Sequence, residues 1–373
     1  MSLRNKLAAG LIAVAGWGAS AQAQILIGQT AGHSGAVASS VKETTAGARL
    51  YFNSINQRGG IAGQKIELIS LDDKFDPKLA VENAKTLIAR GVVTLFLTRG
   101  TPHTQALMPL LTESRIPLVG PSTGAMVLHK PVHPWLFNVR ATYQREAERA
   151  VRHLTQIGVT RIAIVQVDDS FGEDAAQGAL KGFAAGQKPV AHEKYDRSKP
   201  DFGPMMPRLQ KVDPQAVLFI GSGTAVIDGM KAWRATGSKV QMVTLSNNAS
   251  AGFVKGLGDA ARGVIVSQVL PPERSIAVAM VKEANEMAKA LGPAGPEVTP
   301  MLLEGYASAK VLVEGLKRAA AANDLSRDGL RRALETMQPY DLGGLSLSYS
   351  ARDHTGLDYA DLSIIGADGK FKR

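Results

Sequence analysis

Apolar and polar residues alternate along this chain with two different periods. Four apolar residues near the beginning have the i, i+3, i+4, i+7 spacing of a helix that buries one face: Ala48, Tyr51, Phe52 and Ile55. Gly59 and Gly60 end this helix, residues 65–71 alternate as a strand does, and Pro77 opens a second helix. The pattern predicts a repeating unit of strand and helix.

The same alternation continues through the rest of the chain. Further strands are expected at residues 92–97, 116–119, 161–167, 216–220, 240–245, 346–349 and 360–365. Further helices are expected at residues 103–114, 143–156, 171–185, 225–236, 275–291, 301–322 and 326–336. Parallel strands need crossover connections, which the helices supply, and a chain of 373 residues exceeds what one core usually holds. We therefore predict an α/β protein with two doubly wound parallel-sheet lobes.

The first 23 residues have the pattern of a secretory signal peptide. Arg4 and Lys6 precede an apolar run at residues 7–17, which is shorter than the roughly 20 residues of a membrane-spanning helix. Ala21 and Ala23 flank Gln22 as an A-x-A cleavage site does. We expect export to the periplasm and cleavage near Ala23.

Composition narrows the classes of function. The formal net charge is +10, but lysine and arginine are dispersed, which argues against a nucleic-acid surface. Cysteine is absent, so neither a disulfide nor a lipid-modified cysteine can form. The seven histidines show no H-x-x-x-H or H-E-x-x-H spacing. We expect no bound metal, no cofactor and no nucleic-acid partner.

Loops that follow strands are the candidate binding sites, because ligands of open α/β sheets lie beyond the carboxyl ends of the strands. Three such loops offer hydroxyl groups, an imidazole or a glycine that permits close approach: Thr101, His103 and Thr104; Ser122, Thr123 and Gly124; and Ser222. The threonines at 101 and 104 also suit plain helix capping.

An enzymatic alternative rests on the second of these loops. Residues 120–124 spell G-x-S-x-G, which would place Ser122 on the nucleophile elbow of a hydrolase. His192 or His354 lies later in the chain, as that order requires. No second hydrolase signature accompanies the pattern, so we favour a binding protein that is not an enzyme.

Several strings resemble the branched-chain amino acid binding proteins, the type I periplasmic solute-binding components of ABC transporters. In the first third they are Asn56-Gln57-Arg58-Gly59-Gly60, Ile61-Ala62-Gly63, Asp72-Asp73 and Asp76-Pro77. Residues 116–122, 137–140 and 171–173 continue the likeness. The resemblance implies the type I periplasmic binding protein fold, with two lobes joined by a multi-strand hinge. The expected lobes are residues 24–141 plus 272–344 and residues 142–271 plus 345–373.

The resemblance also implies roles for particular residues. The loop at residues 98–104 would bind a ligand's carboxylate and amine, and the loop at residues 120–124 would be the other main contact in the first lobe. Phe171 would close over the ligand unless it is only a buried residue at a helix start. Ser246 stands where family members that hold an α-amino group commonly place a carboxylate. Asp168, Asp169 and Asp228 are the acids that might compensate.

Taken with the resemblance, these features predict the substrate-binding component of an ABC importer. It would trap a small polar or anionic solute, an amino acid or a carboxylic acid, by lobe closure, and deliver it to a membrane permease. We expect a monomer. A periplasmic ligand sensor for a chemoreceptor or kinase uses the same closure and is the alternative.

Overall fold

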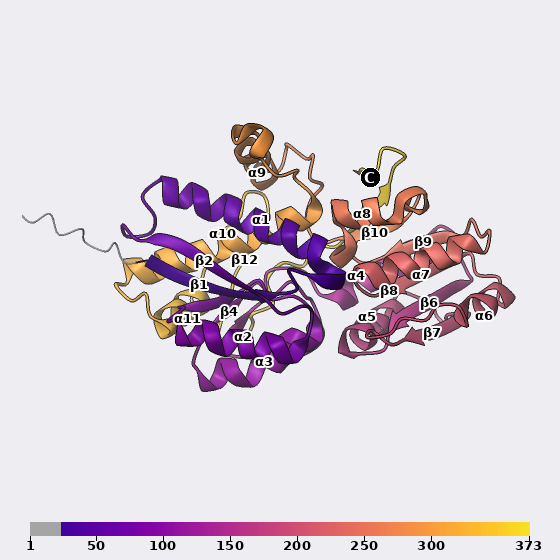
Figure 1. Cartoon of the computed structure of the whole chain (residues 1–373), viewed down its shortest axis with the longest axis horizontal. Helices are drawn as coiled ribbons and strands as arrows, with labels where there is room; N and C mark the ends of the chain where they lie inside the picture. The colour runs from indigo at the N-terminus through magenta and orange to yellow at the C-terminus, as the bar shows by residue number, and fades with distance from the viewer. Residues whose placement is uncertain (1–23) are drawn as a thin grey trace, which may run out of the picture.

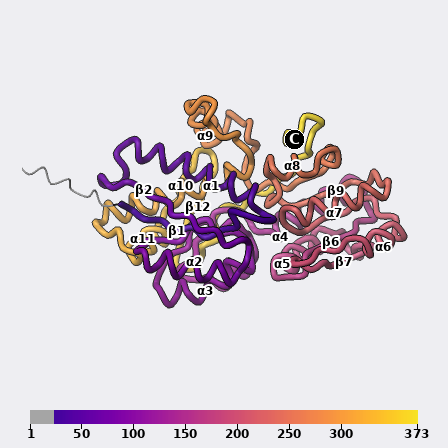
Figure 2. Tube along the Cα trace, in the orientation of Figure 1, coloured from indigo at the N-terminus to yellow at the C-terminus, as the bar shows by residue number. Residues whose placement is uncertain are grey.

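The computed structural model describes residues 24–373, so the predicted signal peptide lies outside the described residues. The chain forms two lobes that lie side by side, each built around its own sheet (Figure 1, Figure 2). Between residues 24 and 373, no helix combines the length and the apolar character that crossing a membrane requires.

The sheet of the first lobe has five parallel strands in the order β2-β1-β3-β4-β5. Its strands are β1 (Gln24–Ala31), β2 (Lys65–Asp72), β3 (Thr94–Phe96), β4 (Leu118–Val119) and β5 (Leu136–Phe137). Neighbouring positions of one strand face opposite sides of the sheet, as in Leu95 and Phe96, which belong to different hydrophobic clusters. Both faces are therefore buried, so β3 and β4 show no alternation of apolar and polar residues.

Helices cover both faces of this sheet. The helices of the first lobe are α1 (Ala38–Gln57), α2 (Pro77–Ala89), α3 (Thr101–Glu113), α9 (Ala279–Ala290), α10 (Pro300–Ala321) and α11 (Arg327–Glu335). Helices α1, α9, α10 and α11 pack in one cluster, and α2 and α3 pack in the other. Gly47 and Gly305 let α1 and α10 approach closely, because a Cβ atom at either would lie within 2 Å of the facing backbone.

The sheet of the second lobe has seven strands in the order β14-β13-β10-β9-β8-β6-β7. They are β6 (Ile162–Val167), β7 (Ala191–Tyr195), β8 (Ala216–Ile220), β9 (Gln241–Thr244), β10 (Ile265–Gln268), β13 (Asp361–Ile365) and β14 (Phe371–Lys372). Strands β6 to β10 are parallel. Strands β13 and β14 are antiparallel, so the expected parallel sheet has an antiparallel edge.

The helices of the second lobe surround one hydrophobic cluster. They are α4 (Tyr143–Gln156), α5 (Ser170–Lys181), α6 (Met205–Lys211), α7 (Thr224–Ala235) and α8 (Ala251–Leu257). Strands β1, β5, β7, β10 and β14 and helices α6 and α8 were not predicted. Strand β7 has the sequence AHEKY, whose polar residues give no apolar alternation because it forms the outer edge beside β6.

The chain passes between the lobes three times. The first two passages follow β5 and β10. The third differs from the predicted boundary at residue 344, because Leu347, Tyr349 and Leu357 pack in the core of the first lobe. We place this passage between Leu357 and Asp361, where β13 begins.

Candidate functional site

A cavity of about 520 Å³ lies between the two lobes. It is lined from the first lobe by Ala36, Lys74, Phe75, Asp76, Pro77, Pro102 and His103, and from the second by Val167, Asp169, Tyr195, Asp196, Arg197, Ser198, Ser222 and Ala225. These residues follow the carboxyl ends of β1, β2 and β3 in one lobe and of β6, β7 and β8 in the other. In each lobe these three strands include the point where the strand order reverses. Open α/β sheets bind ligands at that point.

Phe75 forms the central wall of the cavity on the side of the first lobe. It follows β2 in a turn where both Lys74 and Phe75 have positive φ, 51° and 61°. Asp73 holds this turn, because its carboxylate accepts hydrogen bonds from the Phe75 amide (2.9 Å) and the Thr30 hydroxyl (3.2 Å). Burial raises the pKa of Asp73 to about 6. The backbone strain at two non-glycine residues is consistent with a turn shaped for binding.

Aromatic and cationic side chains sandwich the Phe75 ring. The His103 ring stacks on it with a centroid separation of 4.4 Å. The Arg197 guanidinium, which belongs to the second lobe, lies 5.0 Å from the Phe75 ring centroid. Arg197 also pairs with Asp169 at 2.5 Å, and Asp169 caps α5 by accepting from the amides of Phe171 and Gly172. The two lobes therefore meet at this cation–π contact.

A second group of polar side chains, which we call the paired layer, lies at the contact between the two lobes. It consists of Arg99, Ser122, Arg140, Glu146, Ser246 and Glu304, and all are buried. Arg99 donates to the Ser122 hydroxyl (2.9 Å) and, across the lobes, to the carbonyl of Asn247 (2.7 Å). The Ser122 hydroxyl donates to Glu304 at 2.6 Å. Two arginines and two glutamates balance the formal charge of this layer.

Arg140 and Glu146 form the other half of the paired layer. Arg140 forms an ion pair with Glu146 and donates to the Ser246 hydroxyl at 2.9 Å. Glu146 also accepts from the Ser246 amide (2.9 Å) and the Ser267 hydroxyl (2.5 Å). Burial disfavours the charged form of Arg140, but Glu146, Tyr143 and Glu304 together outweigh that effect and the pKa of Arg140 is raised. The carboxylate of Glu146 therefore reaches Ser246, but this carboxylate is already paired with Arg140.

Four of the nine predicted ligand residues belong to these two regions. Only His103 and Ser222 line the cavity. Ser222 also accepts a hydrogen bond from the Asn247 side chain at 3.1 Å. Ser122 and Ser246 belong to the paired layer. Whether the seven residues outside the cavity contact a ligand stays a prediction.

The remaining five have partners within the protein. Thr101 and Thr123 hydrogen-bond to each other at 2.7 Å, and Thr104 hydrogen-bonds to Thr98 at 3.0 Å. The close approach that Gly124 permits is to the hinge, since a Cβ atom there would lie 2.5 Å from the carbonyl oxygen of Ala141. Phe171 packs in the core of the second lobe, with its ring centroid 4.5 Å from that of Tyr143.

The surroundings of Ser122 do not fit a hydrolase. Its hydroxyl accepts from Arg99 and donates to Glu304, and no imidazole bonds to it. His192 bonds to Gln166, and His354 faces the carbonyls of His133 and Leu136. A nucleophilic serine needs a general base within hydrogen-bond reach, and neither histidine provides one here.

Four residues that line the cavity or belong to the paired layer were not predicted from the sequence. Tyr195 ends the polar edge strand β7 and Arg197 follows it, and Glu146 and Glu304 lie inside helices with an amphipathic pattern. Of the three acids considered as compensation for Ser246, only Asp169 lines the cavity, and it is paired with Arg197.

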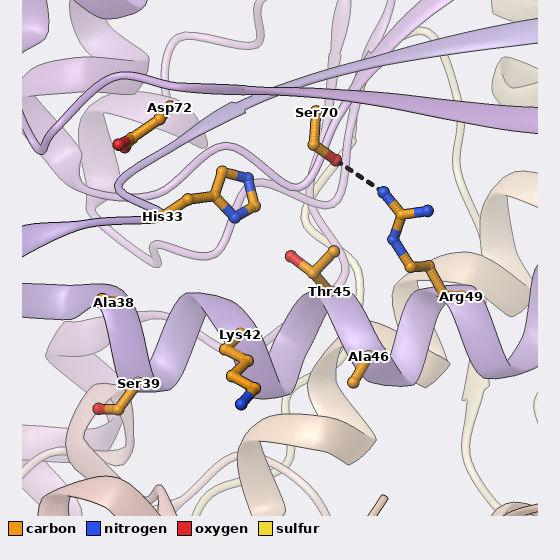
Figure 3. Close-up of a pocket in the computed structure, with 9 residues that line it drawn as sticks. All are labelled: His33, Ala38, Ser39, Lys42, Thr45, Ala46, Arg49, Ser70 and Asp72. Atoms are coloured by element: carbon orange, nitrogen blue, oxygen red, sulfur yellow. Dashed lines mark hydrogen bonds between the residues drawn. The ribbon is translucent and has the colours of Figure 1, made fainter. Parts of the chain in front are cut away.

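A second hollow lies away from the contact between the lobes. Figure 3 shows this groove of about 640 Å³ between α1 and the edge strand β2, with Lys42 and Arg49 on the helix and Asp72 and Ser70 on the strand. Arg49 spans it by donating to Ser70 at 3.3 Å. His33 lines this groove rather than the interlobe cavity. All the lining residues come from the first lobe. Closure of the lobes would therefore add no second wall to this groove.

Comparisons with known proteins agree with this architecture. The sequence model described as "Periplasmic binding protein" matches residues 24–369. The chain is similar to the leucine-specific-binding protein of Salmonella typhimurium, with 24% identity over 76% of each chain. It is also similar to the Leu/Ile/Val-binding protein BraC3 of Rhizobium johnstonii, with 27% identity over 87% of each chain. Among solved structures, a substrate-binding periplasmic protein of Ralstonia solanacearum shares 30% identity with a TM-score of 0.86, covering 94% of this chain and 99% of that one.

Proposed function

Because the chain belongs to the periplasmic binding protein family, we propose that it is the substrate-binding component of an ABC importer. It captures a small polar or anionic solute, an amino acid or a carboxylic acid, between its lobes in the periplasm and delivers it to a membrane permease. Its relatives are ligand-binding proteins and not enzymes, and relatives named for leucine, isoleucine and valine support a ligand of this size. It acts as a monomer.

The observation that carries the proposal is a cavity with one wall from each lobe. A ligand that touches both walls stabilises the closed arrangement by the difference between its affinities for the closed and open forms. The three passages between the lobes provide the hinge that absorbs the rotation. A permease that distinguishes closed from open then receives only loaded protein.

The lobes approach each other closely at two glycines, which supports the proposal that closure requires small residues there. Glu43 on α1 accepts hydrogen bonds from the amides of Ala251 and Gly252, which begin α8 in the second lobe (both 3.2 Å). A Cβ atom at Gly252 would lie 2.3 Å from the Cβ of Ser39 on α1. A Cβ atom at Gly223 would lie 1.8 Å from the carbonyl oxygen of Ala36. Larger residues at these two glycines would hold the lobes apart.

The test replaces Gly252 by alanine. Within helix α8 this change favours folding by up to about 1 kcal/mol, but across the lobes it collides with Ser39. Gly256→Ala is the matched control, because it lies in the same helix and meets only the flexible end of Ile227 in its own lobe. We expect Gly252→Ala to bind at least tenfold more weakly than Gly256→Ala.

A thermal-shift screen of amino acids and carboxylic acids supplies the ligand for this measurement. Small-angle scattering should then show the wild type and Gly256→Ala contracting on binding, and Gly252→Ala failing to contract. The proposal is wrong if neither class of compound binds. Closure as the mechanism is wrong if Gly252→Ala binds and contracts as the wild type does.

A further inference from the structure

Two buried polar side chains in the interlobe cavity have no hydrogen-bond partner among residues 24–373. One is the hydroxyl of Tyr195, at the carboxyl end of β7 in the second lobe, and the other is the imidazole of His103, at the start of α3 in the first. Tyr195 is 4% exposed and His103 is 1% exposed. Buried polar groups almost always have partners, so two exceptions on residues that line one cavity need an explanation.

The fold makes room for the Tyr195 hydroxyl. A Cβ atom at Gly221 would lie 1.8 Å from the hydroxyl oxygen, so a glycine is required at this position. The Tyr195 ring packs on Phe202 with a centroid separation of 4.9 Å, which fixes its direction. Burial raises the pKa of Tyr195, so the group is a neutral donor at physiological pH.

His103 is also neutral. Burial lowers its pKa to about 4, although the nearby backbone carbonyl of Phe75 opposes that shift. Its ring is held by the stack on Phe75. The cavity thus offers one neutral polar group from each lobe, which a ligand that bridges the lobes would satisfy.

The carboxylates that line the cavity are already used. Asp169 accepts from two amides of α5 and pairs with Arg197. Asp76 caps α2 through the amide of Lys78, and Asp196 accepts from the amide and hydroxyl of Ser198. Both Asp76 and Asp196 are exposed at the rim, where a charge pair contributes little. A buried ammonium group therefore has no carboxylate to offset its loss of hydration.

A cation is available instead. Lys74 lines the cavity, and its ammonium group forms no ion pair among residues 24–373. Phe75, Pro77, Pro102 and Val167 supply apolar walls. Building on the proposed function, we infer that the ligand is a small carboxylate with an apolar body and no ammonium group, held by Tyr195 and His103 from opposite lobes.

The experiment compares matched ligands on the purified protein by calorimetry. L-Leucine, L-valine and L-phenylalanine are each paired with the 2-oxo acid of the same carbon skeleton. At least one oxo acid is expected to bind tenfold or more tightly than its amino acid. An amino acid that binds as tightly as its oxo acid overturns the inference and leaves the proposed function standing. If no compound of either class binds, including in the wider screen described above, the proposed function fails as well.

Tyr195→Phe separates a ligand contact from a structural role. Because the hydroxyl has no partner in the protein, its removal should leave the melting temperature unchanged or raised while weakening the bound oxo acid about tenfold. Tyr349→Phe is the control, since the Tyr349 hydroxyl is also buried but donates to the carbonyl of Asn138. This control should lower the melting temperature and leave affinity unchanged. A Tyr195→Phe variant that behaves like Tyr349→Phe overturns the assignment.

Discussion

The paired layer and the interlobe cavity lie next to each other but differ in how their polar groups are satisfied. In the paired layer, Ser122 and Glu146 each have at least two partners within the protein. In the cavity, Tyr195 and His103 have none among the described residues. A buried group with partners stabilises the fold, whereas one without partners costs stability unless something else binds it. The number of hydrogen-bond partners of these four groups, rather than their residue type, distinguishes the two regions.

The sequence pattern does not distinguish these two regions, which is why the hydroxyl-rich loops were predicted to bind the ligand. Serine and threonine after a strand suit both a ligand site and an internal network, and the two uses have the same sequence pattern. In this protein Arg99 and Glu304 reach the Ser122 loop and occupy it. The predictions below test whether the paired layer is structural and the cavity is functional.

Arg140 gives the largest expected effect. Arg140→Met leaves Glu146 buried without its countercharge and should lower the free energy of unfolding by about 3–5 kcal/mol. The midpoint of urea denaturation measures this loss. Adding Glu146→Gln removes the stranded charge and should recover part of it. A loss below about 1 kcal/mol for Arg140→Met would contradict a structural role for the paired layer.

Ser122→Ala tests the part of the paired layer that belongs to the first lobe. The change removes one hydrogen bond to Glu304 and one from Arg99, so we expect a loss of about 3 kcal/mol in unfolding free energy. Thr86→Ala is a control on the exposed side of α2, where the hydroxyl bonds only to the carbonyl of Glu82. Ser122→Ala with unchanged stability and weaker ligand binding would instead restore the sequence prediction that Ser122 contacts the ligand.

Much of the fold followed from periodicity, and less of the site did. The bounds of α4 and β8 agree with the predicted residues 143–156 and 216–220, because their apolar stripes are long and bounded by clear turns. No local pattern encodes the strand order β2-β1-β3 or the way the carboxyl ends of the two sheets face each other, because both depend on long-range contacts. Phe75 and Tyr195 lie more than a hundred residues apart and share the cavity only because the lobes meet. The sequence therefore indicated which loops reach the cleft but not which side chains remain unpaired there.

The smallest effect uses pH to compare two buried histidines. His103 lines the cavity and His129 does not, yet burial lowers the pKa of each to about 4. The unfolded chain takes up a proton below pH 6.5 while the folded protein resists it, so stability falls as the pH drops from 7 toward 4. At pH 5 each group costs about 2 kcal/mol relative to pH 8. His103→Phe and His129→Phe should each remove that part of the pH dependence in urea titrations. Only His103→Phe should also weaken binding of the oxo acid at pH 7. Equal affinity in the two variants would contradict a role in ligand binding that distinguishes the cavity from the rest of the buried interior.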